Sequence, residues 1–304
     1  MKRILWFALL VCAVSLMVSG CAFGVAGAQA ENDMPTLVAQ TLTAVSIEAS
    51  RNPTATSQPT LTLTPAPTAT ATPQPTPTWA FNPSGKVIAP ILLYHHIAET
   101  DVPNRYYVPP AQFEEHMKWL ADNGYTTIPV TLLVEALTKG AELPARPVVI
   151  TFDDGDLDVY TNAFPIMQRY GQVGVFYLVA GWKDAKTVVP KENISEMIAA
   201  GWEIGSHSMT HLDLTKNHSE LGREVVASRQ VLKDTFQAAV NTFAYPFGSI
   251  DPPSANKVIE AGYLAGMGLG VSYTHTLYDL YYLNRLEVRS DYTMEQFIAL
   301  LPWK

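Results

Sequence analysis

The sequence has almost no cysteine, and its two cysteines, Cys12 and Cys21, both lie near the N-terminus. The rest of the chain therefore has neither a disulfide nor a thiol nucleophile, and any metal site in it must be built from His, Asp and Glu. The chain also lacks an excess of positive charge, because its formal net charge is −8 at pH 7. An acidic protein gains no attraction to a phosphate backbone, so we expect no nucleic-acid partner.

An uncharged apolar run follows Lys2 and Arg3 and covers residues 4–18, too short to span a bilayer comfortably. Residues 1–30 are therefore typical of an export signal. The run ends in Val-Ser-Gly-Cys, which resembles the lipobox of bacterial lipoproteins, and this resemblance implies a lipid anchor on Cys21. Cleavage after Ala30 is the main alternative, and retention as an uncleaved anchor is a third. With a lipid on Cys21 the protein would lie on the extracellular face of the cell membrane. After cleavage at Ala30 it would be secreted.

Residues 53–78 consist almost entirely of Thr, Pro, Ala and Gln. Such a stretch cannot bury enough apolar surface to offset its ordering entropy. We predict a disordered Thr/Pro-rich linker over residues 31–84, which would serve as a spacer across a cell wall; a low-complexity insert without function is the alternative. A single folded domain is predicted over residues 85–304, and we expect it to be monomeric.

Short β-rich apolar runs alternate with amphipathic stretches along the folded part, which indicates the α/β class with parallel strands joined by helical crossovers. Roughly seven such units favour a closed or nearly closed barrel over an open sheet. The predicted strands are 87–94, 126–128, 148–152, 175–179, 203–205, 242–245, 264–267 and 283–288. The predicted helices are 110–123, 132–139, 159–170, 192–200, 221–236, 254–261 and a last one from residue 294.

Two adjacent carboxylates, Asp153 and Asp154, follow the predicted strand 148–152. In α/β barrels active sites lie where such strands end. Two carboxylates at the end of an apolar strand are costly unless something neutralises them. A metal would neutralise one and leave the other free as a base. The alternative is a turn or helix-capping pair followed by Gly155.

Two histidines, His207 and His211, follow the predicted strand 203–205. Imidazoles four residues apart converge on one metal if the segment turns helically. With one carboxylate they would make a three-ligand site with open positions, suited to zinc-activated water. On its own, such a pair is more often an ordinary surface or core feature.

A third polar cluster, Tyr94-His95-His96, ends the first predicted barrel strand. A histidine there is expected to titrate near neutral pH and so to donate a proton. A hydrogen-bonded structural histidine is the alternative.

Together the motifs Thr-Phe-Asp-Asp-Gly (151–155), His-Ser-Met-Thr-His (207–211) and Phe-Ala-Tyr-Pro-Phe-Gly (243–248) resemble those of the polysaccharide deacetylase (NodB homology) family. The resemblance covers residues 87–304 and implies a distorted (β/α)7-type barrel. It implies Asp153 as general base and a divalent metal, zinc by expectation, on Asp154, His207 and His211. The implied reaction is metal-dependent hydrolysis of N-acetyl groups on an extracellular amino-sugar polysaccharide, with release of acetate.

The sequence departs from the family pattern at two places. The third motif usually carries an arginine where Ala244 stands, and Arg285 is the candidate to supply that charge from a late strand. The late Leu-x-x-His motif is absent, and a Tyr-His precedes the Asp-Asp pair instead. This arrangement resembles the circularly permuted branch that includes poly-β-1,6-N-acetylglucosamine deacetylases. That branch implies His95 as general acid, with His96 the weaker candidate, and a backbone N–H near Tyr245 is expected to hold the oxyanion.

Four other functions compete with this interpretation. A glycoside hydrolase needs carboxylates about 5 to 10 Å apart, which adjacent side chains are poorly placed to provide. A catalytically silent carbohydrate-binding protein on the same fold is favoured by the missing arginine and disfavoured by the intact Asp-Asp and His-x-x-x-His. An O-acetyl esterase of the xylan type and an amidase on a small non-sugar substrate complete the set. Loss of activity on chelation would exclude simple glycoside hydrolysis.

Overall fold

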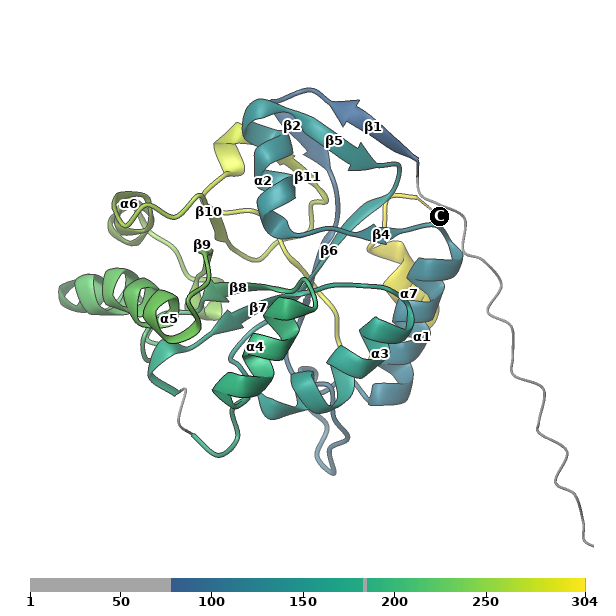
Figure 1. The fold of residues 1–304 in the computed structure, drawn as a ribbon, viewed down its shortest axis with the longest axis horizontal. Coiled ribbons are helices and arrows are strands. Elements are labelled where there is room, and N and C mark those ends of the chain that lie inside the picture. Colours follow the sequence, from purple (N-terminus) through teal and green to yellow (C-terminus); the bar gives the residue numbers. More distant parts are fainter. Residues whose placement is uncertain (1–77, 183–184, 304) are drawn as a thin grey trace, which may run out of the picture. The chain divides into compact units, whose positions relative to one another are not determined.

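The computed structural model describes residues 78–182 and 185–303 (Figure 1). The predicted signal segment, Cys21 and most of the predicted linker lie outside these residues. Among the helices of the described part, none is both long enough and apolar enough to cross a membrane.

A curled sheet of parallel strands forms the centre of the described part (Figure 1). Its order is β10-β9-β8-β7-β6-β3-β12, and every neighbouring pair is parallel. The strands are β3 (Ile91–Tyr94), β6 (Pro147–Phe152), β7 (Val175–Leu178), β8 (Glu203–Ser206), β9 (Val240–Ala244), β10 (Ala265–Met267) and β12 (Leu286–Glu287), with β4 (Thr126–Thr127) beside β6. The predicted α/β class with a parallel sheet is confirmed.

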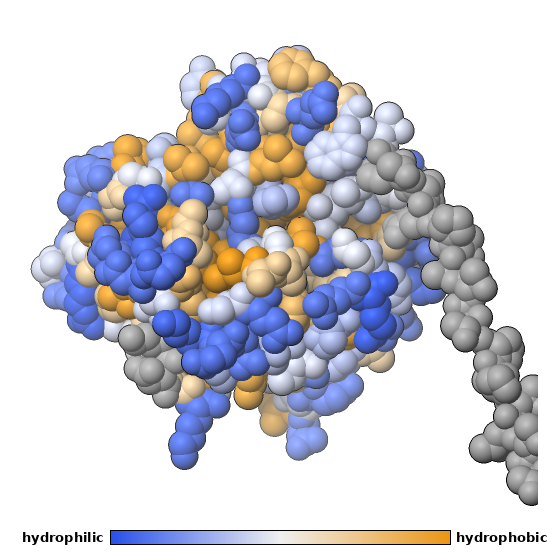
Figure 2. Space-filling model, in the orientation of Figure 1, coloured by the Kyte–Doolittle hydropathy of each residue, from blue (hydrophilic) through white to orange (hydrophobic). Residues whose placement is uncertain are grey.

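Helices between the strands cover the outer side of this sheet, and α1, α3, α4 and α5 follow one another around it in Figure 1. Hydrophilic residues dominate the face over α4 and α5 (Figure 2), as expected of helices that bury one side only. The helices are α1 (Pro110–Asp122), α2 (Val130–Lys139), α3 (Phe164–Arg169), α4 (Lys191–Ala199), α5 (Ser228–Phe236), α6 (Pro252–Glu260) and α7 (Met294–Ala299).

Side chains alternate between the two faces of β6, and this alternation orients the residues that follow it. Val148, Ile150 and Phe152 pack in the outer core beneath the helices. Val149 packs in a separate inner core enclosed by the curled sheet. Because successive residues of a strand point to opposite faces, Asp153 continues the inner row.

The segment that ends in β12 links the two edges of the curled sheet. On one side Leu283 donates to the carbonyl of Gly266 and accepts from Gly268, and on the other side β12 pairs with β3. A Cβ at Gly266 would lie 2.6 Å from the backbone oxygen of Tyr281, and one at Gly268 would lie 2.3 Å from the ring of Tyr282. Only glycine allows the closing segment to approach β10 this closely.

Several elements differ from the sequence prediction. Two antiparallel pairs were not predicted: β1 (Trp79–Asn82) with β5 (Ala141–Pro144), and β2 (Lys86–Ile88) with β11 (Thr274–Thr276). The predicted strand 87–94 is divided into β2 and β3 at Pro90, which has no N–H for a ladder. Because β1 is paired, the folded part begins before Gly85.

The predicted helices 159–170 and 221–236 also differ, because they contain π-helical turns at Val159–Ala163 and Gly222–Ala227. Such turns are rare in α-helices and occur often beside functional sites.

Candidate metal and catalytic site

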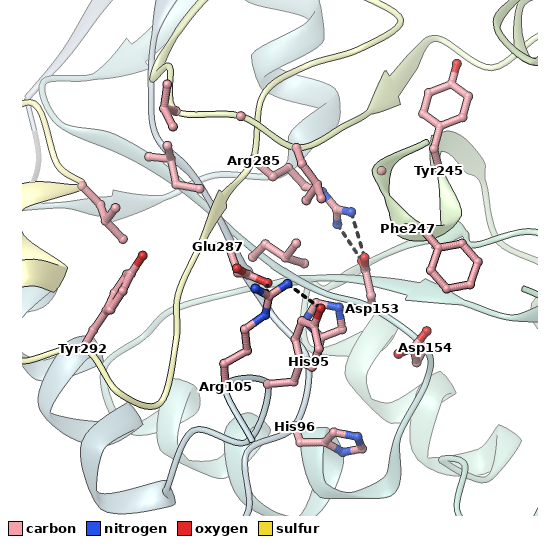
Figure 3. Close-up of a pocket in the computed structure, with 18 of the residues that line it drawn as sticks. His95, His96, Arg105, Asp153, Asp154, Tyr245, Phe247, Arg285, Glu287 and Tyr292 are labelled. Atoms are coloured by element: carbon pink, nitrogen blue, oxygen red, sulfur yellow. Dashed lines mark hydrogen bonds and ion pairs between the residues drawn. The ribbon is translucent and has the colours of Figure 1, made fainter. Parts of the chain in front are cut away.

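The polar clusters predicted from the sequence meet at one end of the parallel sheet. His95 follows β3, Asp153 and Asp154 follow β6, and His207 follows β8. Because parallel strands end at the same edge, these side chains line one cavity of about 820 Å³ (Figure 3).

Asp154, His207 and His211 have ligand atoms that all lie within 4.8 Å of one another. Asp154 Oδ1 is 3.6 Å from His207 Nε2 and 3.4 Å from His211 Nε2. Ligand atoms about 2.0–2.2 Å from a tetrahedral zinc ion lie roughly 3.3–3.6 Å apart. The spacing of these three side chains therefore fits a common ion.

The chemistry of the donor set fits a metal as well. Asp154 Oδ1 is buried and has no hydrogen-bond partner among the described residues. His207 Nδ1 is 2.8 Å from the carbonyl of Ala244, so it carries the proton and leaves Nε2 as a lone-pair donor. Burial lowers the pKa of both His207 and His211, which keeps them neutral at pH 7, as a ligand must be.

His207 and His211 converge without the helical turn that the sequence prediction assumed. Ser208 and His211 both have positive φ, 69° and 61°, and the loop bends through these two residues. Asp154 (72°) and Phe247 (61°) share this conformation, so four of the five described non-glycine residues with positive φ lie at the site. Such strain costs free energy and gathers at functional sites.

Arg285 and Asp153 form a buried, bidentate ion pair (dashed lines in Figure 3). Arg285 Nη1 and Nη2 donate to Asp153 Oδ1 at 2.6 Å and Oδ2 at 2.8 Å, and Nε donates to the carbonyl of Gly268. Burial alone would raise the pKa of Asp153, but the charge of Arg285 outweighs burial and holds it well below its usual range. The structure thus places the guanidinium of Arg285 against Asp153. Ala244, at the motif position where the family has an arginine, accepts a hydrogen bond from His207 through its carbonyl.

His95 differs from the sequence prediction in its electrostatics. Burial lowers its pKa to about 4, and the nearby charge of Asp153 offsets this only in part. The ring is therefore neutral at pH 7, whereas the sequence suggested titration near neutrality.

His96, the weaker candidate, has a partner of its own. His96 Nδ1 is 2.8 Å from Asp158 Oδ2. Burial would lower the pKa of His96, but this hydrogen bond and the charge of Asp156 outweigh burial and raise it.

The N–H of Tyr245 itself is engaged in the sheet, so the predicted oxyanion contact from a backbone N–H near Tyr245 stays a prediction for its neighbours. That N–H donates to the carbonyl of Met267 at 3.1 Å, as part of the register between β9 and β10. In Figure 3 the phenol of Tyr245 points away from Asp153. Its backbone is used by the sheet, and its ring packs against Phe243.

Known proteins resemble this chain over much of its described part. Residues 140–266 match the family model described as polysaccharide deacetylase. The chain is therefore similar to polysaccharide deacetylases over this segment. This similarity agrees with the resemblance seen in its motifs.

Similar proteins extend the match beyond that segment. The Bacillus subtilis protein YxkH is 29% identical over 213 residues, which cover 70% of this chain and 75% of YxkH. The poly-β-1,6-N-acetyl-D-glucosamine N-deacetylase of Staphylococcus aureus is 25% identical over 214 residues, covering 66% and 73%. The crystal structure of BC0361, a polysaccharide deacetylase from Bacillus cereus, superposes with a TM-score of 0.63 at 26% identity, covering 71% of this chain and 69% of that one.

Two carboxylates that support the site were missed from the sequence. Asp158 Oδ1 accepts the N–H of Ile97, two residues after His95, and Asp158 Oδ2 holds His96. Glu224 lies fully buried behind the loop that carries His211. In the sequence both look like ordinary polar residues at the start of helices, and no motif marks them.

Proposed function

We propose that this protein is a metal-dependent N-deacetylase of an extracellular amino-sugar polysaccharide. The observation that carries the proposal is the contrast between two adjacent carboxylates. Both oxygens of Asp153 are paired with Arg285, while Asp154 keeps a buried oxygen that has no partner among the described residues and faces two neutral histidines. A divalent cation is what such a donor set lacks.

Asp154, His207 and His211 would hold the ion, and zinc suits two imidazoles and one carboxylate. When bound, such an ion lowers the pKa of water and polarises a carbonyl. Asp153 is the general base in this proposal. Arg285 fixes the orientation of its carboxylate and keeps it ionised, and a carboxylate has further lone pairs to accept a proton.

His95 would deliver a proton to the departing amine. Because its pKa is lowered to about 4, it meets the substrate as a neutral ring. The proton that it donates must therefore be taken up during the reaction, and the proton released by the attacking water is the available source. His95 thus acts as a relay rather than as an acid that is charged from the start.

An amino-sugar polymer is the proposed substrate class. Support comes from the similarity to a poly-β-1,6-N-acetyl-D-glucosamine N-deacetylase. Two partly exposed aromatic rings, Trp182 and Phe247, flank His211 with ring centroids 5.8 and 4.6 Å from the imidazole. Aromatic faces of this kind suit stacking against sugar rings.

The test is acetate release from N-acetylated oligosaccharides by the wild type, Asp153→Asn and His211→Ala, each with and without chelator. We expect activity only in the wild type, with loss on chelation and recovery with added zinc. Equal rates in all three proteins, or full activity in chelator, would refute the proposal. Including O-acetylated xylan in the panel distinguishes the N-deacetylase from an ester hydrolase on the same site.

We also propose the domain plan predicted from the sequence with its last boundary moved to β1: a signal with its lipobox over residues 1–30, a linker that ends before β1, and the deacetylase domain from β1 to residue 304. Cys21 would carry the lipid that holds the enzyme on the outer face of the membrane. Replacing Cys21 with Ala should move the protein from the membrane fraction to the medium. Unchanged partition would argue for cleavage after Ala30 or for retention of the signal.

A further inference from the structure

The loop that carries His211 has a strained backbone, and few hydrogen bonds within the loop stabilise it. It leaves β8 at His207 and bends at Ser208 and His211, both in the left-handed region. Between His207 and His211, the one internal hydrogen bond with a side chain in the described structure is that of Ser208 Oγ, which accepts the N–H of His211 at 2.9 Å. Other parts of the chain must therefore hold His211 in place.

One side of the loop rests on Glu224. Its Oε2 accepts the N–H groups of Met209 at 3.0 Å and Thr210 at 2.8 Å, and its Oε1 accepts the hydroxyl of Thr210 at 2.8 Å. Glu224 is fully buried, whereas its nearest cation, Arg223, is half exposed and 3.9 Å away. A buried carboxylate is costly unless it is well hydrogen-bonded, and here the loop provides these bonds.

The opposite side of the loop rests on the turn after β7. The N–H groups of Ala180 and Gly181 donate to the carbonyls of Ser208 and Met209 at 3.0 and 2.8 Å. A Cβ at Gly181 would lie 2.5 Å from the Met209 oxygen, so this turn fits closely. The loop is thus clamped between N–H donors on one side and a single carboxylate on the other.

Glu224 reaches the loop from a separate element, the π-helical turn Gly222–Ala227. Helix α5 continues directly from this turn, and its first residue contacts the end of β8, where Ser228 Oγ is 2.9 Å from Ser206 Oγ. The helix is therefore fixed to the strand before His207 and to the loop before His211. This arrangement lets one buried side chain set the distance between the two imidazoles.

We propose that Glu224 is a positioning residue that preorganises His211 as a metal ligand, so that metal affinity depends on a carboxylate that does not touch the metal. This inference rests on the metal site of the proposed function. It assigns to Glu224 a role in ligand geometry, separate from its contribution to the stability of the fold.

The test measures zinc affinity of the full chain by competition with a chelating dye, beside urea unfolding and the kinetics of acetate release. Glu224→Ala should weaken zinc binding by about 10–100-fold, the range found for residues that orient metal ligands. Its kcat should recover largely when zinc is in excess, with KM little changed. Glu224→Gln, which keeps the shape and one acceptor oxygen, should lose only several-fold in affinity and serves as the folded variant if the alanine protein does not fold.

Glu203 provides a matched control. It accepts the N–H and the hydroxyl of Thr131, and it lies at the start of β8, whereas His207 follows the end of that strand. Glu203→Ala should lower stability and leave zinc affinity unchanged. If Glu224→Ala and Glu224→Gln lower stability but bind zinc like the wild type, Glu224 is only structural and the inference fails. If the wild type itself binds no zinc, the metal site of the proposed function fails first.

Discussion

Asp153 and Asp154 are neighbours in the chain, yet their carboxylates differ in how far the protein itself supplies them with partners. On the Asp153 side, both carboxylate oxygens are bonded to Arg285 and the pKa of Asp153 is lowered. On the Asp154 side, one buried oxygen has no partner in the described part of the chain. Burial raises the pKa of Asp154 and the charge of Asp153 adds to this, against the opposing effect of His207. One side is satisfied by the protein itself, and the other requires a cation.

The strongest test of this difference exchanges each carboxylate for its amide. Asp154→Asn should abolish zinc binding and lower the rate by more than about a thousandfold, beyond the loss of a single oxyanion donor. Asp153→Asn should keep stoichiometric zinc and lose about 10²–10⁴-fold as a general-base variant. Zinc content and acetate release measure both. Retention of zinc by Asp154→Asn would contradict the assignment of the two sides.

The paired side can be broken without touching either carboxylate. Arg285→Met removes the guanidinium that pairs with Asp153 and should cost about 3–5 kcal/mol, because a buried charge is left uncompensated. Adding Asp153→Asn to this variant should recover much of the loss. Urea unfolding of the two single variants and the double variant gives the coupling. Additive losses would mean that the pair contributes little.

His95 lies near Asp153, and its proposed role in protonating the leaving amine can be tested separately from the role of the metal. His95→Gln should lower deacetylation of an N-acetylated oligosaccharide by about a hundredfold, the scale of general acid catalysis. The same variant should lose much less on 4-nitrophenyl acetate, whose leaving group needs no proton. Equal losses on both substrates would show that His95 positions the substrate instead.

The smallest expected effect is on stability in the metal-free protein, and its sign differs between the two sides. Asp154 has a raised pKa, so stability falls as the pH rises from the unfolded-state value of 3.8 through the folded-state value. Asp153 has a lowered pKa, so its contribution is present above 3.8 and is lost as the pH falls towards its folded-state value. In chelator at pH 7, Asp154→Asn should therefore be more stable than the wild type, and Asp153→Asn less stable. A loss of stability in both variants would contradict the raised pKa of Asp154.

The sequence predicted the parts of this molecule that depend on local pattern. The apolar run at 148–152, the helices between strands and the placement of polar clusters after strands all follow from residue order alone, and the α/β class with its parallel sheet is confirmed. The charge on a late strand was also predicted, and Arg285 lies against Asp153.

Features that depend on distant partners could not be predicted. The strands β1 and β11 are short and pair with residues far away in the chain, so no periodicity marks them. The pKa of His95 depends on burial by the folded chain, and the N–H of Tyr245 is engaged through the register of two strands. Glu224 looks like a solvent-facing helix residue until the loop beneath it is in place.

The contact between β10 and the segment leading into β12 bears on which parts of the chain are needed to complete the site. The stretch 140–266 includes all three candidate ligands, while His95 comes from before it and Arg285 from after it. These two side chains arrive on β3 and on the segment that docks beside it. The three candidate ligands thus precede Arg285 in the chain, and Asp153 can receive its counter-charge only when the C-terminal part is present. The proposed hydrolysis would thus require that β12 has paired with β3.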